Sequence, residues 1–439
     1  MGEFGALRRA LCRPPTNAAI PMIVSQGEQY DTQGHSRAVP ATSARAPSRT
    51  VSIDYLRALV VFLVVAFHSM LAYLPLAPAP AQRFVGGLEA WRGIPVVDSQ
   101  RWAGAGLFIV ISDTFFMALM FFLSGLFVWR SLRRKGTMSF LRDRILRLGL
   151  PFLFGVGVIL PLTHYASYLQ SSGEAGFENY WRAWRALSYW PSGPMWFISM
   201  LLAFDIVAAG LFALAPHWGE RVGALASSAR ERPARFFAVV VILSAFAFIP
   251  LAIAYGAGSW THWGYWGLFQ FQTSRPLHYF VYFAMGVGVG AHGLRQGLLS
   301  PHGELARRWR RWLLAAVVSN VLSVLLVVGI VTSKEPAHPI VVYLGDAAFV
   351  LSCATACFAL LAVFTHFAQR SSPICDSLAA NSYGIYVVHY AFVAWLQFAL
   401  LQVSLSGLEK APFVTAAAYL ASWLTTAAVR RLPGVARIV

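Results

Sequence analysis

Arg57 and His68 are the residues of this sequence best placed for chemistry, because both lie in one long apolar segment, Tyr55–Leu74. Eleven residues of helix return to nearly the same face and rise about 16 Å, so the two side chains share one side. A histidine near the middle of a bilayer is costly and marks a functional site by default. A simple hydrogen bond from His68 to a neighbouring helix explains the histidine about equally well. The arginine on the same face favours function.

A second pair of basic residues opens a later apolar segment. Arg144 and Arg147 lie three residues apart, which makes them neighbours on a helix, just before Leu148. Two adjacent guanidinium groups repel each other unless an anion lies between them, and arginine forks suit phosphate oxygens. The pair therefore indicates a phosphate site. Two structural explanations stay open: an ion pair between Asp143 and Arg147, and anchoring at a membrane face.

Membrane helices must carry these residues. The 439-residue chain is 57% hydrophobic and 12% charged, about half the charged fraction of a soluble domain. Ten apolar stretches approach the length that crosses a hydrocarbon core of about 30 Å, and backbone in lipid must bond within its own segment. The ten predicted helices are Tyr55–Leu74, Leu107–Trp129, Leu148–Tyr168, Met195–Leu214, Phe236–Tyr255, Pro276–His292, Trp312–Val331, Ile340–Phe364, Leu378–Leu401 and Phe413–Val429. We predict an all-α, polytopic membrane protein.

The net charge of +17 has a topological origin, because most basic residues fall in alternate loops. The positive-inside rule then predicts that both termini are cytoplasmic. This distribution gives no support to a nucleic-acid partner. The first fifty residues are rich in Ala, Pro, Ser, Thr and Arg without an apolar run, which predicts a disordered basic cytoplasmic tail over residues 1–51. The ten-helix domain then occupies residues 52–439.

The cysteines indicate no metal or redox site. Cys353 and Cys357 lie four residues apart on one predicted helix, but no histidine stands at ligand spacing beside them. Core packing is therefore favoured over a metal or redox pair, and the sequence predicts no metal site.

Aromatic residues gather in two predicted outward loops. They are Tyr180, Trp181, Trp184, Tyr189 and Trp190 in one loop, and Trp260, Trp263, Tyr265 and Trp266 in the other. Two interpretations stay open. The residues form an interfacial belt, as aromatic side chains do at membrane surfaces, or they form a platform for the apolar ring faces of a sugar.

Five short motifs occur in order on the predicted helices, and together they resemble the acyltransferase 3 family of ten-helix membrane O-acyltransferases. The motifs are Arg57 with His68, Phe115–Met117 with Phe121–Gly125, Arg144 with Arg147, Pro194–Ile198, and Asn381–His389. The resemblance runs from about Ser52 to Val429. The arrangement from Arg144 through Gly149 to Pro151 is similar to that of glucan-succinylating proteins of the glucans biosynthesis protein C type.

The resemblance implies transfer of an acyl group, acetyl or succinyl, from cytoplasmic acyl-CoA to a hydroxyl of an extracytoplasmic glycan or related acceptor. It implies an integral inner-membrane protein with acyl-CoA as co-substrate and no permanently bound cofactor. His68 would be the catalytic base or a transient acyl carrier, since neutral imidazole is available near pH 7. Arg57, Arg144 and Arg147 would hold the CoA phosphates. The acceptor side would use Trp196, Tyr383, His389 and Asp113, the last also as an orienter of His68.

A proton-coupled secondary transporter is the alternative, because ten helices with midplane carboxylates and histidines suit such a carrier. Two observations count against it: the two halves show no evident similarity, and the conspicuous arginines gather at one face.

Overall fold

The computed structural model describes residues 50–75, 77, 94–172, 176–187, 190–256, 263–333 and 338–437. Residues 1–49 of the predicted tail lie outside this range. The first eight helices are α1 (Val51–Leu71), α2 (Ala103–Gly125), α3 (Val128–Lys135), α4 (Thr137–Arg144), α5 (Leu150–Phe154), α6 (Leu160–Ser172), α7 (Phe177–Arg185) and α8 (Trp196–Leu214). The others are α9 (Trp218–Ser227), α10 (Pro233–Tyr255), α11 (Pro276–His292), α12 (Glu304–Arg307), α13 (Trp309–Thr332), α14 (Pro339–Phe367), α15 (Pro373–Ala399) and α16 (Gly407–Val429).

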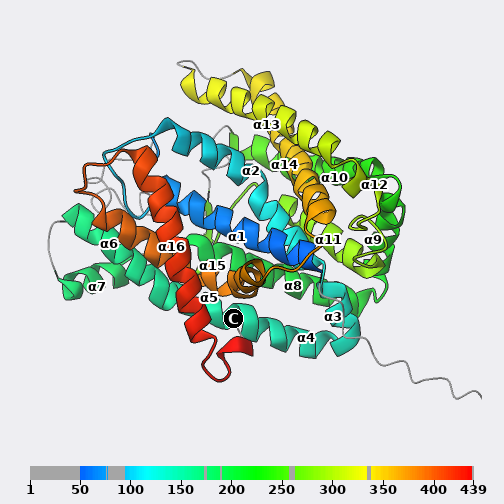
Figure 1. Cartoon of the computed structure of the whole chain (residues 1–439), viewed down its shortest axis with the longest axis horizontal. Helices are drawn as coiled ribbons and strands as arrows, with labels where there is room; N and C mark the ends of the chain where they lie inside the picture. Colours follow the sequence, from blue (N-terminus) through cyan, green and yellow to red (C-terminus); the bar gives the residue numbers. More distant parts are fainter. Residues whose placement is uncertain are drawn as a thin grey trace, which may run out of the picture. The chain divides into compact units, whose positions relative to one another are not determined.

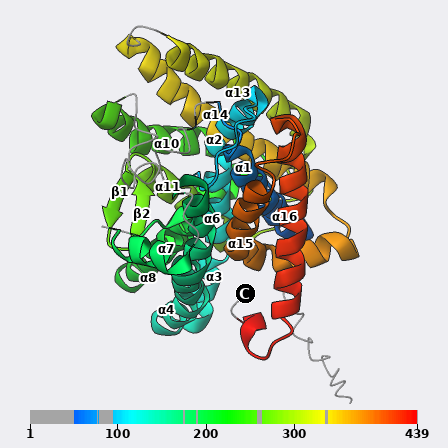
Figure 2. The same ribbon diagram turned by 90° about the vertical axis from the view of Figure 1, so that its left-hand side faces the viewer.

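The predicted all-α class is confirmed for the described part of the chain, and each of the ten predicted segments falls on a helix. Eight helical stretches are long and apolar enough to cross a membrane. The other two predicted spans correspond to α11, which has only 17 residues, and α15, which carries polar side chains along its length. The limits of α11 agree with the prediction. One hairpin was not predicted: β1 (Trp263–Trp266) pairs antiparallel with β2 (Phe269–Gln272), close to α8 (Figure 2).

The predicted span Leu148–Tyr168 is a composite helix rather than a regular one. Two π-helical turns, Ile145–Gly149 and Gly155–Ile159, interrupt it on either side of α5. Pro151 lacks an N–H, so it cannot bond to the carbonyl four residues earlier, which belongs to Arg147. That carbonyl instead accepts a hydrogen bond from the Tyr383 hydroxyl on α15, at 2.7 Å. Such π turns often occur at functional sites, and the first of the two, Ile145–Gly149, contains Arg147.

Helix α1 packs against both α2 and α15, as Figure 1 shows for the blue, cyan and orange ribbons. Helix α11 meets α2 almost backbone to backbone, since a Cβ at Gly286 would lie 2.1 Å from Phe122 O and one at Gly290 would lie 2.0 Å from Leu126 O. Small residues permit this close approach between membrane helices. The hairpin of α13 and α14 lies at the edge of the bundle, where α13 buries only Ala316, Ser319 and Ser323.

Candidate functional site

Two histidines from distant helices meet inside the bundle. His68 on α1 and His389 on α15 approach to 3.2 Å between His68 Nδ1 and His389 Nε2. His389 Nδ1 lies 2.6 Å from Tyr386 O, and a carbonyl accepts only from a protonated nitrogen. Neutral His389 therefore presents a lone pair at Nε2. His68 Nδ1 also faces a carbonyl, Val64 O at 2.8 Å, so its N–H is shared between that oxygen and His389.

These partners assign the tautomer of His68. Its Nδ1 carries the proton, which leaves the Nε2 lone pair available in the cavity that His68 lines. His389 is fully buried and lies behind His68, outside that cavity. The arrangement is a base whose orientation and protonation state are held by a second imidazole.

Helix α15 also holds the backbone of α1 beside His68. The side-chain amide of Gln397 donates to His68 O at 3.1 Å and to Ser69 O at 3.0 Å. Tyr390 contributes an edge-to-face contact with the His68 ring, at 5.0 Å between centroids. The imidazole is thus restrained through its ring, its Nδ1 and its own carbonyl.

The histidine cavity, defined by His68, Trp196 and Asp113 among its lining residues, has a volume of about 180 Å³. Trp196 begins α8, where it stacks on Tyr279 at 5.8 Å between ring centroids, and Trp263 of β1 lines the same cavity. Gly193 lies directly before α8 with φ of +45°, and a Cβ there would approach Leu160 Cδ2 to 2.6 Å. Glycine therefore permits both the turn and the close packing that place Trp196.

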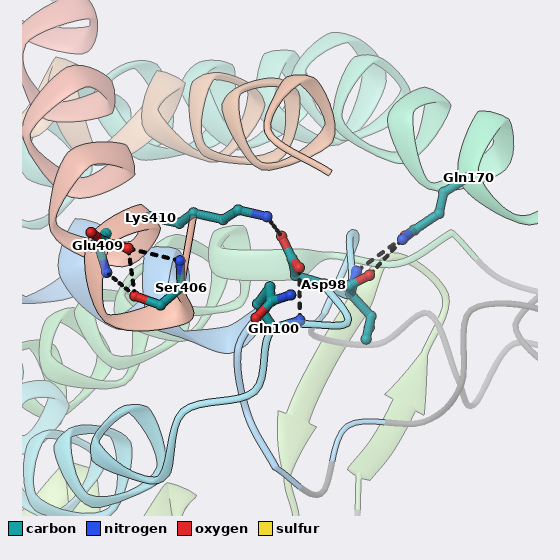
Figure 3. A network of polar contacts seen from close by, with 7 residues as sticks. Asp98, Gln100, Gln170, Ser406, Glu409 and Lys410 are labelled. Carbon is teal, nitrogen blue, oxygen red and sulfur yellow. Dashed lines mark hydrogen bonds and ion pairs between the residues drawn. The ribbon is translucent and has the colours of Figure 1, made fainter. Parts of the chain in front are cut away.

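The loop over residues 94–102 forms another wall of the histidine cavity through Ile94. Figure 3 shows how this loop is tied down: the Lys410 ammonium on α16 donates to Asp98 Oδ2 at 2.8 Å, with both side chains almost fully buried. The side-chain amide of Gln170 on α6 exchanges two hydrogen bonds with the backbone of Val97.

A second cavity, the arginine cavity, has a volume of about 330 Å³ and is lined by Arg57, Arg144 and Arg147. Arg144 lies 3.2 Å from the buried Asp205 carboxylate of α8, and Arg57 lies 3.2 Å from Asp54. Within the described residues Arg147 makes no ion pair, so its guanidinium is available to a ligand. The suggested pair of Asp143 with Arg147 is not found.

Asp143 instead binds the Lys135 ammonium, because the turn between α3 and α4 folds Lys135 back over it. Both side chains are partly exposed on that turn, and Asp143 interacts with Arg147 only electrostatically, at longer range than an ion pair. The three arginines thus line one cavity. Of the three, only Arg147 makes no ion pair with a carboxylate in the described part of the chain.

Two acceptor-side candidates lie away from the histidine cavity, and a third is held in an ion pair. Tyr383 lines the arginine cavity, because the π turn at Arg147 draws its hydroxyl to that side. His389 lies behind His68. Asp113 lines the histidine cavity but does not orient His68, because its carboxylate binds the Arg275 guanidinium at 2.6 Å. Trp196 lines the histidine cavity, on the side where the acceptor was expected.

Tyr386 and Arg275 are site residues that sequence reasoning missed as functional candidates. Tyr386 lines both cavities, and its hydroxyl donates to Pro194 O. A signal was present for Tyr386, which lies within the motif Asn381–His389. None was present for Arg275, which sits alone in a loop.

The aromatic loops divide into structural and site residues. Tyr180 and Trp184 pack in the core, where the Tyr180 hydroxyl donates to Pro161 O and burial raises the pKa of that phenol. Trp263 reaches the histidine cavity, whereas Trp266 is 80% exposed. Tyr189 and Trp260 lie outside the described residues.

Long apolar helices around an internal histidine pair, with a cavity at each side of Tyr386, define a multi-pass membrane protein with an internal chemical site. The sequence matches the family model of an acyltransferase domain over residues 50–427. The chain therefore belongs to the acyltransferase 3 family and is an acyl-transferring enzyme. No curated protein and no solved structure matches it.

Proposed function

We propose that this enzyme transfers an acyl group, acetyl or succinyl, from cytoplasmic acyl-CoA to a hydroxyl of an extracytoplasmic carbohydrate or related acceptor. One observation carries the proposal: His68 lines a cavity that shares a wall residue, Tyr386, with the arginine cavity. A donor held by arginines and an acceptor in the histidine cavity can then meet at one base. The loop charges support a topology with both termini cytoplasmic in an inner membrane.

The reaction needs only one base. His68 Nε2 takes the proton of the acceptor hydroxyl as its oxygen attacks the thioester carbonyl. A new C–O bond forms, the C–S bond breaks, and the CoA thiolate recovers the proton from the imidazolium. His389 serves as a positioning residue, since its Nε2 lone pair holds His68 Nδ1–H and stabilises the positive charge that develops on His68.

The ion pairs of the cavity arginines indicate where the acyl donor would bind. CoA phosphates would bind Arg147 first, because that guanidinium makes no ion pair within the described residues, while Arg144 keeps Asp205 and Arg57 keeps Asp54. The acceptor side is aromatic, and the rings of Trp196 and Trp263 offer apolar faces of the kind that sugar rings stack on.

A glycan comparison tests this function directly. Mass spectrometry of periplasmic and cell-surface glycans, from cells with the gene, without it and with His68→Ala, should show an O-acyl modification only with the intact gene. The mass added distinguishes acetyl from succinyl. Identical glycans in the three strains would contradict the proposal.

The transporter alternative keeps one supporting observation, the buried carboxylate and histidine side chains of the bundle. It requires no affinity for a thioester. Binding of acyl-CoA to purified protein, measured by titration, therefore separates the two functions.

A further inference from the structure

A third cavity, which we call the Arg275 cavity, lies beside the histidine cavity. Its volume is about 350 Å³, and Phe67, Leu71, Asp113 and Gln272 line both cavities. The histidine cavity alone, at about 180 Å³, is smaller than the roughly 300–1,000 Å³ typical of ligand sites. An acceptor presented to His68 therefore needs more room than that cavity offers, and the Arg275 cavity is the adjoining space.

The walls of the Arg275 cavity are mainly apolar. They come from the peripheral hairpin α13–α14, through residues such as Val327, Ile330 and Phe349, and from α10 through Phe248. The next residue along α13, Val328, is 50% exposed on the outer surface of the same helix. Val331, which lines the cavity, is itself 42% exposed, so the cavity lies close to the outer surface of α13. This position suits a ligand with an apolar part.

Three charged groups give the cavity a polar end. The Arg275 guanidinium, 4% exposed, is held by Asp113, by the Tyr279 hydroxyl at 3.1 Å and by the face of Phe349 at 5.0 Å, yet its buried Nε has no hydrogen-bond partner among the described residues. Asp346 Oδ2 is likewise buried without one. Two carboxyl groups against one guanidinium disfavour an anion. A neutral ligand with hydroxyl groups can satisfy both atoms.

We propose that the Arg275 cavity binds the apolar part of an amphiphilic, uncharged acceptor, a glycoside or polyol with an alkyl chain or ring system, while its hydroxyl reaches His68. Acylation of this ligand rests on the proposed function, whereas binding of the ligand in the cavity does not. Asp346 and Arg275 Nε hold hydroxyl groups of the acceptor, and α13 and α14 cover its chain. A free, fully polar sugar would leave these apolar walls unfilled.

Photolabelling tests the site without relying on catalysis. The protein, reconstituted in lipid nanodiscs, is labelled with dodecyl maltoside carrying a diazirine in its chain, and a phosphatidylcholine with the same diazirine chain is the comparison. We expect saturable labelling of α13 and α14 peptides by the glycoside, competed by unlabelled dodecyl maltoside and not by maltose. Equal labelling by the phospholipid would identify ordinary annular lipid and overturn the proposal.

Matched variants sharpen the result. Val327→Trp fills the cavity and should lower saturable labelling at least tenfold, whereas Val328→Trp, the same change one residue along, should leave it unchanged. Asp346→Asn, which keeps the shape of the side chain, should weaken the glycoside about tenfold through loss of a charge-assisted hydrogen bond. Unchanged acyl-CoA binding shows that each variant is folded. Equal labelling of Val327→Trp and Val328→Trp would contradict the site.

Transfer assays then separate this inference from the proposed function. With acetyl-CoA and succinyl-CoA tried in turn as donors, O-acylation of dodecyl maltoside should exceed that of maltose at least tenfold with the active donor, and Val327→Trp should remove the difference. Transfer to maltose at the same rate would overturn the inference and leave the acyltransfer intact. Saturable labelling without transfer to any acceptor would instead contradict the proposed function.

Discussion

His389 Nε2 lies 3.2 Å from His68 Nδ1, although 321 residues separate the two histidines in the sequence. The contact joins the first and the ninth of the predicted spans, so neither helix can shift without moving the base. It also distinguishes the roles of the two rings. Of the two, His68 lines the histidine cavity and His389 does not, so in the proposed reaction His389 acts through His68.

Replacement of His389 should therefore lower kcat and spare KM for acyl-CoA. His389→Phe keeps the bulk of the ring but removes the lone pair, and we expect about a 10²-fold loss in kcat, the scale of a small misplacement of a reacting group. His389→Gln offers an amide oxygen to His68 Nδ1–H and should recover part of the rate. Steady-state kinetics of the two variants measure the difference. An equal loss of kcat in the Phe and Gln variants would show that His389 contributes only to packing.

His68→Ala should abolish detectable transfer, because the loss of a general base alone removes about 10²- to 10⁴-fold in rate. Acyl-CoA should still bind, since the proposed site for its phosphates is the separate arginine cavity. Transfer assays together with a CoA titration test both halves of the expectation. His68→Ala with near-normal transfer would eliminate the mechanism.

Replacement of Arg147 and of Arg144 should have different effects, on acyl-CoA affinity and on stability respectively. Arg147→Gln should weaken acyl-CoA about 10- to 100-fold without loss of stability, because the guanidinium has no protein carboxylate to leave behind. The matched control is Arg142→Gln, an exposed arginine one turn away that does not line the cavity. Isothermal titration compares the two. Equal affinities of both variants and the wild type would leave Arg147 as a membrane anchor.

Arg144→Gln should instead destabilise the protein, by about 3–5 kcal/mol, because it strands the buried Asp205 carboxylate. The double variant Arg144→Gln with Asp205→Asn should regain much of that stability, since no unpaired charge remains. Thermal denaturation in detergent measures both. A single variant as stable as the wild type would show that the pair contributes nothing.

Lys410→Met should destabilise the protein on the same scale, because Asp98 would stay charged inside the loop over residues 94–102. Asp98→Asn combined with Lys410→Met should be more stable than Lys410→Met alone. The acceptor KM should rise in the single variant, since Ile94 of the same loop lines the histidine cavity. Lowered stability with an unchanged acceptor KM would show that the loop does not affect acceptor binding.

Hydropathy predicted the helices well because a membrane span is a property of consecutive residues. The limits of α11 agree with the prediction, and Arg57, Arg144 and Arg147 share one cavity. Partners across helices could not be predicted. Asp205 beside Arg144 and His389 beside His68 depend on packing between segments far apart in the chain.

The cysteines show the same limit. Sequence spacing placed no histidine near Cys353, yet His278 of α11 approaches its sulfur, with 3.5 Å between Sγ and Nε2. On α15, the family resemblance implied that Tyr383 serves the acceptor side. The Tyr383 hydroxyl instead donates to Arg147 O, a carbonyl that Pro151 leaves without its helical partner, and the sequence of α15 alone contains no information about that contact.

Tyr386 is the one described residue that lines both the arginine cavity and the histidine cavity, and its hydroxyl is tied to Pro194 O. In the proposed reaction the two substrates approach from opposite sides of the membrane, so the two cavities together resemble a pore. We expect the Tyr386 ring between them to block protons and small ions, which would otherwise follow the path of the acyl group.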